Sequence, residues 1–134
     1  MNKSWKDYLT KEDKLHIAVY DYICLQYPKI LCVHVANEAK RSPFERWKAK
    51  KMGLTAGVPD LLIFFQREII ENSSVKICSG LAIELKVIYA NGTRNKASKP
   101  QEKILTELDK NGWISRVIWT FEDAKKEVDK YLNI

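Results

Sequence analysis

Cysteine is scarce in this sequence, which contains three cysteines in 134 residues. Cys24, Cys32 and Cys78 are odd in number, and no two are close enough to form a CxxC pair. This pattern argues against a disulfide framework and against a zinc knuckle. Because small extracellular domains usually depend on disulfides, we expect a reducing, intracellular and cytoplasmic setting.

Long hydrophobic runs are also absent. No apolar run reaches the roughly 18 residues that a membrane-spanning helix needs. The polar start "MNKSWKDYLTKEDK" lacks the apolar region of a signal peptide. The sequence has no repeats, low-complexity tracts or obvious second domain. With 46% hydrophobic and 30% charged residues, it predicts a soluble globular protein in which residues 1–134 form one domain.

Positive charge is in excess. The net charge is +6, and the segment from Lys40 to Lys51 holds six basic residues and one acid. A second basic cluster runs from Arg94 to Lys103. A single cluster is as consistent with a solvated surface as with a binding surface. Two clusters near Phe44, Trp47 and Tyr89 favour a surface that binds the phosphates of nucleic acid. The candidate contacts are Lys40, Arg41, Arg46, Lys48, Lys50, Lys51, Arg94, Lys96 and Lys99.

Apolar spacing and turn residues predict the order α-β-β-β-α-β-α. A first helix starts after the N-cap candidate Thr10 and ends at Pro28, and a later helix starts at Ser98 and stops at Gly112. Residues 37–57 are expected to be a basic loop, with a helical turn around residues 45–51 left open, and residues 66–80 a hairpin connection. The strands are expected at residues 30–36, 59–65, 81–89 and 113–120, and the last helix at residues 121–132. Helices on both faces of a mixed sheet are the expected α/β architecture.

Two charged residues interrupt the apolar strand "LAIELKVIY". Side chains alternate along a strand, so Glu84 and Lys86 share one face with Ala82. An unpaired charge in a buried strand is costly. One interpretation is a Glu–Lys ion pair on a strand at the edge of the sheet. The other is that both side chains face a ligand.

Asp60 favours the second interpretation. It follows Pro59 at the start of an apolar strand, downstream of Gly53 and Gly57, although an aspartate in a turn is also common there. Two carboxylates on neighbouring strands can hold a hard divalent cation. A lysine two residues from one carboxylate can orient water or stabilise charge on a phosphate. Glu84 would then meet a metal ion, and Lys86 an anionic substrate.

Two helical residues point toward the same place. Glu12 lies on the apolar stripe of the first helix, where it is either a site residue or a first-turn acid favoured by the helix dipole. Gln101 lies on the apolar side of its helix, where it is either a site residue or the capping-box partner of Ser98. His16 and His34 receive no catalytic role.

These residues and their order resemble the VRR-NUC (virus-type replication-repair nuclease) family of the PD-(D/E)xK nuclease superfamily. The resemblance runs from about Glu12 to Tyr131 and covers nearly the whole chain. It rests on the acid of the first helix and on the segments "NEAKRS", "MGLTAGVPDLLIF", "GLAIELKV", "SKPQ", "GW" and "VIWTFEDA". The PD and ExK motifs are weak alone, whereas the ordered set with its glycine-rich lead-in is fairly specific.

The resemblance implies a restriction-endonuclease-like fold and cleavage of DNA phosphodiester bonds that depends on Mg²⁺ or Mn²⁺. Asp60 and Glu84 would be metal ligands, and Lys86 the catalytic lysine. Glu12 would support the metal or its water, and Gln101 would help to position the site. His16 departs from the pattern, because glutamine is expected after the first-helix acid.

The small size of the chain bears on its expected substrate and assembly. Small standalone members of the family resemble structure-selective nucleases that dimerise and cut branched DNA, so the resemblance implies a homodimeric, Holliday-junction resolvase-like endonuclease of a prokaryotic or phage-infected cell. Four aromatic residues are expected to be exposed and are candidates for the dimer interface: Trp5, Tyr8, Trp47 and Trp113. The alternatives are a restriction-type or general nuclease without junction preference, and a nucleic-acid-binding module whose carboxylates are structural.

Overall fold

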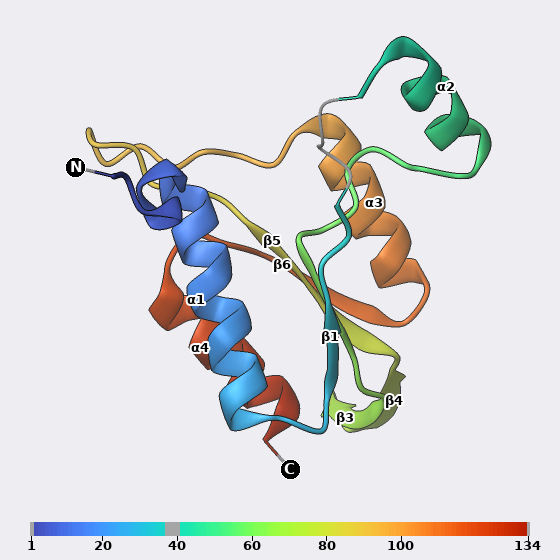
Figure 1. The fold of residues 1–134 in the computed structure, drawn as a ribbon. Coiled ribbons are helices and arrows are strands. Elements are labelled where there is room, and N and C mark those ends of the chain that lie inside the picture. Colours follow the sequence, from blue (N-terminus) through green and yellow to red (C-terminus); the bar gives the residue numbers. More distant parts are fainter. Residues whose placement is uncertain (1, 37–40, 134) are drawn as a thin grey trace.

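The computed structural model describes residues 2–36 and 41–133, and Figure 1 shows their arrangement. After a 3₁₀ helix at Trp5–Tyr8, the elements in chain order are α1 (Lys11–Gln26), β1 (Leu31–Val33), α2 (Pro43–Lys51), β2 (Leu61–Phe64), β3 (Arg67–Glu71), β4 (Ser74–Cys78), β5 (Gly80–Leu85), α3 (Lys99–Lys110), β6 (Trp113–Ile118) and α4 (Phe121–Leu132). The predicted order is present in α1, β1, β2, β5, α3, β6 and α4. The structure also contains the helix α2 and the β3–β4 hairpin, which lie between the predicted elements in the chain.

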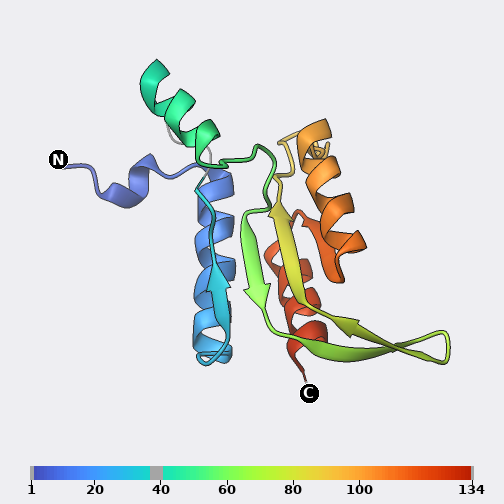
Figure 2. The same ribbon diagram turned by 90° about the vertical axis from the view of Figure 1, so that its right-hand side faces the viewer.

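The strands form a mixed sheet in the order β1-β2-β5-β6. β1 pairs antiparallel with β2, β2 pairs antiparallel with β5, and β5 pairs parallel with β6. The parallel pair needs a crossover connection, and α3 supplies it. β3 and β4 pair only with each other and extend from the body as a two-stranded arm (Figure 2). The mixed α/β architecture is the predicted one.

The apolar core lies between the sheet and the helices α1 and α4. These two helices lie side by side on one face of the sheet, and α3 lies on the other (Figure 1). The core residues include Val19 and Ile23 of α1, Leu61 and Ile63 of β2, Leu81, Ile83 and Leu85 of β5, and Val128 and Leu132 of α4. Because side chains alternate along a strand, the even-numbered Ala82 and Glu84 of β5 point to the face that carries α3. Within the described ranges, no helix is long and apolar enough to cross a membrane.

Local capping fixes where two of the helices begin. Thr10 and Asp13 form a reciprocal capping box at the start of α1, and Ser98 and Gln101 form one at the start of α3. Each box satisfies two backbone N–H groups that the helix itself leaves unpaired. The predicted starts of both helices are therefore confirmed. The capping box of α3 also holds the Gln101 side chain at the start of the helix.

The segment expected to be a basic loop contains the regular helix α2. The Ser42 hydroxyl accepts a hydrogen bond from the Glu45 N–H at 3.2 Å, and Pro43 occupies the first turn, where its missing N–H is not needed. α2 covers the helical turn that was left open at residues 45–51. Its full length was not predicted, because these start signals lie among basic residues with no apolar periodicity. α2 buries no side chain and projects away from the body (Figure 1).

Candidate functional site

Strand pairing brings Asp60 and Glu84 together. The pairing of β2 with β5 matches Leu61 with Ile83 and Leu62 with Ala82. Carried one residue further, the same register sets Asp60 opposite Glu84. Residues directly opposite one another in an antiparallel pair have Cβ atoms about 4.5–5.5 Å apart. Asp60 Oδ2 also accepts a hydrogen bond from the Leu85 N–H at 2.7 Å, which fixes its carboxylate against β5.

The loop before Asp60 packs tightly on the start of α3. Gly57 has a φ of +90°, and a Cβ at this position would lie 2.5 Å from the Pro100 carbonyl oxygen. Glycine is therefore required there for both backbone conformation and space. This close approach holds the segment that leads to Asp60 beside the helix turn that carries Gln101.

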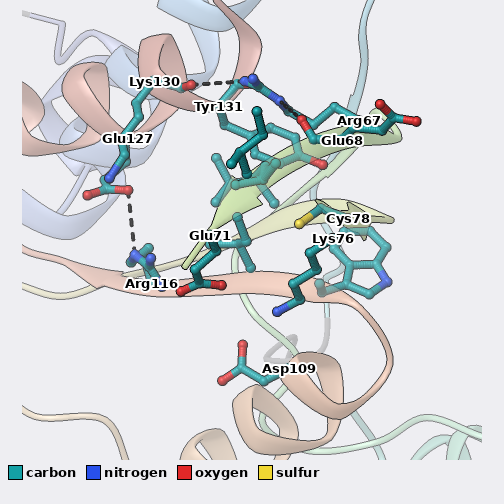
Figure 3. Close-up of a pocket in the computed structure, with 15 residues that line it drawn as sticks. Arg67, Glu68, Glu71, Lys76, Cys78, Asp109, Arg116, Glu127, Lys130 and Tyr131 are labelled. Carbon is teal, nitrogen blue, oxygen red and sulfur yellow. Dashed lines mark hydrogen bonds and ion pairs between the residues drawn. The ribbon is translucent and has the colours of Figure 1, made fainter. Parts of the chain in front are cut away.

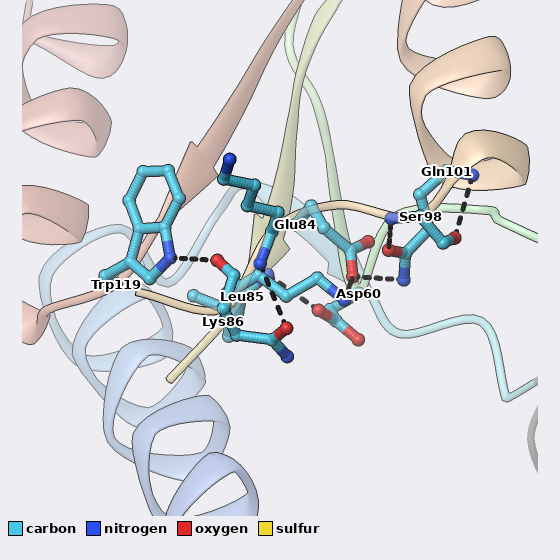
Figure 4. A network of polar contacts seen from close by, with 9 residues as sticks. Asp60, Glu84, Leu85, Lys86, Ser98, Gln101 and Trp119 are labelled. Atoms are coloured by element: carbon cyan, nitrogen blue, oxygen red, sulfur yellow. Dashed lines mark hydrogen bonds and ion pairs between the residues drawn. The ribbon is translucent and has the colours of Figure 1, made fainter. Parts of the chain in front are cut away.

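Glu84 is the buried centre of the polar network in Figure 4. Its side chain lies in a central strand, and the residue is only 2% exposed. Its Oε1 accepts a hydrogen bond from Gln101 Nε2 at 2.8 Å and lies 3.7 Å from Lys86 Nζ. Its Oε2 is buried, and the described residues offer it no hydrogen-bond partner. The interpretation of an ion pair on an edge strand was wrong in its location, since β5 lies between β2 and β6.

Gln101 closes the capping box of α3 and also contacts Glu84. Its Oε1 accepts a hydrogen bond from the Ser98 N–H at 2.8 Å, which closes the capping box. Its Nε2 donates to Glu84 in the same conformation. One side chain thus joins the start of α3 to the centre of the site (Figure 4).

The electrostatics of the site disfavour the charge on Glu84. Burial raises the pKa of Glu84 to about 8, and the neighbouring Asp60 carboxylate is the next largest cause. The Lys86 ammonium acts in the opposite direction, while Glu12 adds a further negative charge that raises the pKa. Three acids and one lysine therefore share this space. A positively charged ligand would offset the repulsion among the carboxylates and would give the unpaired Glu84 oxygen a partner.

Two histidines that were assigned no catalytic role lie beside Asp60. The rings of His16 and His34 meet edge to face with their centroids 4.4 Å apart. His34 Nδ1 lies 2.7 Å from the backbone carbonyl oxygen of Asp60. Burial lowers the pKa of His16, with His34 as the next cause. The signal available in the sequence was the spacing of four residues between Glu12 and His16, which sets both on one helix face.

The predicted nucleic-acid contacts lie away from the core. Among the described candidates, Arg41 is half-buried, and Arg46, Lys48, Lys50, Lys51, Arg94, Lys96 and Lys99 are exposed. The whole segment "NEAK", which includes Lys40, falls outside the described residues. The rings of Phe44 and Trp47 stack on α2 with centroids 6.2 Å apart, and both residues are exposed.

The candidate interface aromatics divide into two groups. Trp5, Tyr8 and Trp47 are exposed, as expected. Trp113 is half-buried and packs edge to face against Phe64 at a centroid distance of 5.2 Å. Its ring occupies the space above Gly80, where a Cβ would lie 2.4 Å from it. The expectation that Trp113 is exposed was therefore wrong.

A cavity of about 760 Å³ lies elsewhere, between the β3–β4 arm, β6 and α4 (Figure 3). Its lining includes Arg67, Lys76, Arg116 and Glu127 but none of the predicted catalytic or metal-binding residues. This cavity is thus separate from the carboxylate site. The carboxylate site is identified by its chemistry and not by its depth.

The comparisons with known proteins bear on the fold. No protein-family model matches the chain, and no curated protein matches it significantly. Among solved structures, the chain is similar to one described as a "VRR_NUC domain protein", with a TM-score of 0.68 and 22% sequence identity over 93% of this chain and 90% of that chain. At this identity the likeness concerns the fold. The resemblance read from the sequence is thus confirmed at the level of architecture: the chain has the fold of a VRR_NUC domain protein.

Proposed function

We propose that this protein is a PD-(D/E)xK-type nuclease that hydrolyses DNA phosphodiester bonds with the help of a divalent cation, Mg²⁺ or Mn²⁺. The observation that carries the proposal is Glu84, a buried carboxylate with an unpartnered oxygen, opposite Asp60 and beside Lys86. Strongly perturbed acids beside a lysine are typical of catalytic sites. The fold likeness to a VRR_NUC domain protein supports the same activity.

The residues present suit a hard cation, because such ions prefer carboxylate oxygens. Asp60 and Glu84 would hold it, with Glu12 nearby. When bound, the cation supplies positive charge that activates water and stabilises the phosphate in the transition state. Lys86 reaches the same space and would orient the attacking water or neutralise a phosphate oxygen. Gln101 would keep Glu84 in position by the 2.8 Å hydrogen bond.

The basic residues supply a surface for the DNA backbone. The exposed lysines and arginines of α2 and of residues 94–99 flank the loops that lead into the site. Contacts to phosphates carry little sequence information but set affinity and make binding strongly dependent on salt. Removal of one such charge should therefore weaken binding modestly, whereas removal of a site residue should stop cleavage.

The test is a nuclease assay on linear, nicked, flapped and four-way DNA with Mg²⁺, Mn²⁺ or EDTA. Lys86→Ala should lower the cleavage rate by at least about 100-fold while DNA binding stays within a few-fold, since a preorganised charge in a transition state is worth that much. Lys126→Ala, an exposed lysine on α4, is the matched control. Cleavage in EDTA, or a Lys86→Ala variant that cuts at the wild-type rate, would overturn the proposal. DNA binding with no cleavage of any substrate would identify a binding module.

We further propose that the protein is a homodimer that prefers four-way junctions. Two cuts related by two-fold symmetry need two sites, and a C2 dimer supplies them. The projecting basic α2 and the exposed Trp5, Tyr8 and Trp47 support this assembly. Sedimentation should give a dimer, and competition binding should favour four-way over linear DNA of equal length. A monomer without junction preference would indicate a restriction-type or general nuclease.

A further inference from the structure

A second group of metal-binding side chains adjoins the carboxylate site. One ring nitrogen of His16, one ring nitrogen of His34 and one carboxylate oxygen of Asp60 lie within 4.8 Å of one another. The three come from different parts of the fold: α1, the segment after β1, and the residue before β2. The nuclease proposal uses Asp60 but neither histidine.

The hydrogen bond of His34 prepares its ring for a metal. The Asp60 backbone carbonyl can only accept, so His34 Nδ1 donates to it across 2.7 Å. In the neutral ring, Nε2 then keeps its lone pair. Metal-binding histidines are commonly held in this way, with the second ring nitrogen donating to a backbone carbonyl or a carboxylate. His34 is exposed, so an ion can reach the group from solvent.

The donor set defines the class of ion. Two imidazole nitrogens and one carboxylate suit Zn²⁺, Co²⁺ and Ni²⁺, whereas Mg²⁺ and Ca²⁺ prefer oxygen alone. Tetrahedral coordination at about 2.0–2.1 Å places ligand atoms about 3.3 Å apart. The observed separations of up to 4.8 Å exceed this distance, so metal binding would draw the three side chains closer together.

A second observation points independently to a cation in this neighbourhood. Glu84 is 2% exposed, faces Asp60 across the β2–β5 pairing, and has an oxygen without a hydrogen-bond partner among the described residues. Asp60 can thus contribute to two sets of metal ligands. In one set its partner is the carboxylate of Glu84, and in the other its partners are the two histidine nitrogens.

We propose that His16, His34 and Asp60 bind a borderline transition-metal ion of the Zn²⁺ class, next to the oxygen-lined site and with Asp60 common to both. The proposal concerns metal binding and stands whether or not the protein cleaves DNA. It gives the chain two adjoining sites of different chemical preference.

The direct test uses the full-length wild-type protein without a histidine tag. The chain contains two histidines, so the ring nitrogens can be assigned by long-range ¹⁵N NMR. Addition of Zn²⁺ should shift the ring signals of both histidines together at stoichiometric concentration, and the same amount of Mg²⁺ should shift neither. Unchanged signals with Zn²⁺, or a shift of only one ring, would overturn the proposal.

Variants separate this site from the nuclease site. His16→Phe and His34→Phe keep an aromatic ring for the edge-to-face contact but remove the nitrogens. Each should weaken Co²⁺ binding, followed by visible absorption, by at least about tenfold. Glu84→Gln should leave Co²⁺ binding within a few-fold while it abolishes DNA cleavage, so the two proposals can fail separately. Co²⁺ binding that survives both phenylalanine variants would refute the histidine site.

Discussion

Two polar clusters in this molecule shift the pKa of a carboxyl group in opposite directions. Asp129 of α4 accepts hydrogen bonds from the hydroxyls of Tyr22 at 2.5 Å and Tyr27 at 2.7 Å, and from Lys125 Nζ at 2.9 Å. Burial acts to raise the pKa of Asp129, but these donors outweigh it, so the pKa is lowered. Glu84 has one hydrogen-bond donor, a lysine ammonium 3.7 Å away and acidic neighbours, and its pKa is raised to about 8.

The difference separates a structural carboxylate from a candidate functional one. The partners of Asp129 tie α1 to α4, and its charge is stabilised by the protein alone. The charge of Glu84 is disfavoured by the protein alone, and a cation from outside would stabilise it. Glu84 should therefore be important for activity and dispensable for folding, and Asp129 should be the reverse.

The largest expected effect comes from Glu84→Gln. Cleavage should fall by more than about 100-fold. The free energy of unfolding in EDTA at pH 8 should change little, because relief of the repulsion from Asp60 opposes the loss of the ion pair with Lys86. Single-turnover cleavage and urea denaturation measure the two quantities, and Glu71→Gln on the exposed arm is the control. A destabilised variant that still cuts would place Glu84 in the same class as Asp129.

Asp129→Asn should have a smaller effect of the opposite kind. It should lower the free energy of unfolding by about 1–3 kcal/mol, since hydrogen bonds to a charged acceptor are lost or weakened. Cleavage per folded molecule should not change. Urea denaturation tests this, with Glu122→Gln, exposed on the same helix, as the control. A variant of wild-type stability with impaired cleavage would contradict the comparison.

Two glycines can test how the Glu84 cluster is held together without any change to its members. Gly53 and Gly57 have φ values of +99° and +90°, so alanine is strained at either position by about 1–2 kcal/mol. Only at Gly57 would the new Cβ meet Pro100, since nothing lies within 4 Å at Gly53. Gly57→Ala should therefore be less stable than Gly53→Ala by about 1 kcal/mol or more, and it should also cut more slowly. Equal thermal denaturation and equal cleavage rates would show that the loop is not held on α3.

The raised pKa of Glu84 also predicts a pH dependence of stability. The pKa of Glu84 is about 8 in the folded protein and 4.5 in its ordinary state. The folded state thus binds more protons in this range, and stability should fall as pH rises from 4.5 to about 8. Urea midpoints in EDTA should show a steeper decline for the wild type than for Glu84→Gln, and parallel declines would remove the assigned cause.

Local signals made much of the fold predictable. Each of these signals spans only a few residues of the sequence. They are the capping boxes at Thr10 and Ser98, the turn before β4, and the alternation that puts Glu84 and Lys86 on one face. The start signal of α2 at Ser42 and Pro43 was equally local. The full length of α2 was not predicted, because this helix buries no apolar face and its apolar residues therefore show no helical spacing.

The parts that could not be predicted depend on contacts distant in sequence. Asp60 faces Glu84 only because β2 and β5 pair in one register. The ring of His34 meets that of His16 only when α1 packs beside β1. Trp113 is half-buried because Gly80, on the neighbouring strand, leaves space for its ring. None of these contacts leaves a pattern in a single segment of the chain.

The tip of the β3–β4 arm gives the molecule a natural point of division. Asn72 and Ser73 are exposed, with φ values of 51° and 64°, and they connect β3 to β4 beyond the body of the protein (Figure 2). A cut there would leave Glu12 and Asp60 on one fragment and Glu84, Lys86 and Gln101 on the other. Neither fragment would hold a whole site. The site would return only when β2 and β5 paired again, so the arm is the place to build a complementation reporter in which two halves, fused to other proteins, signal their encounter.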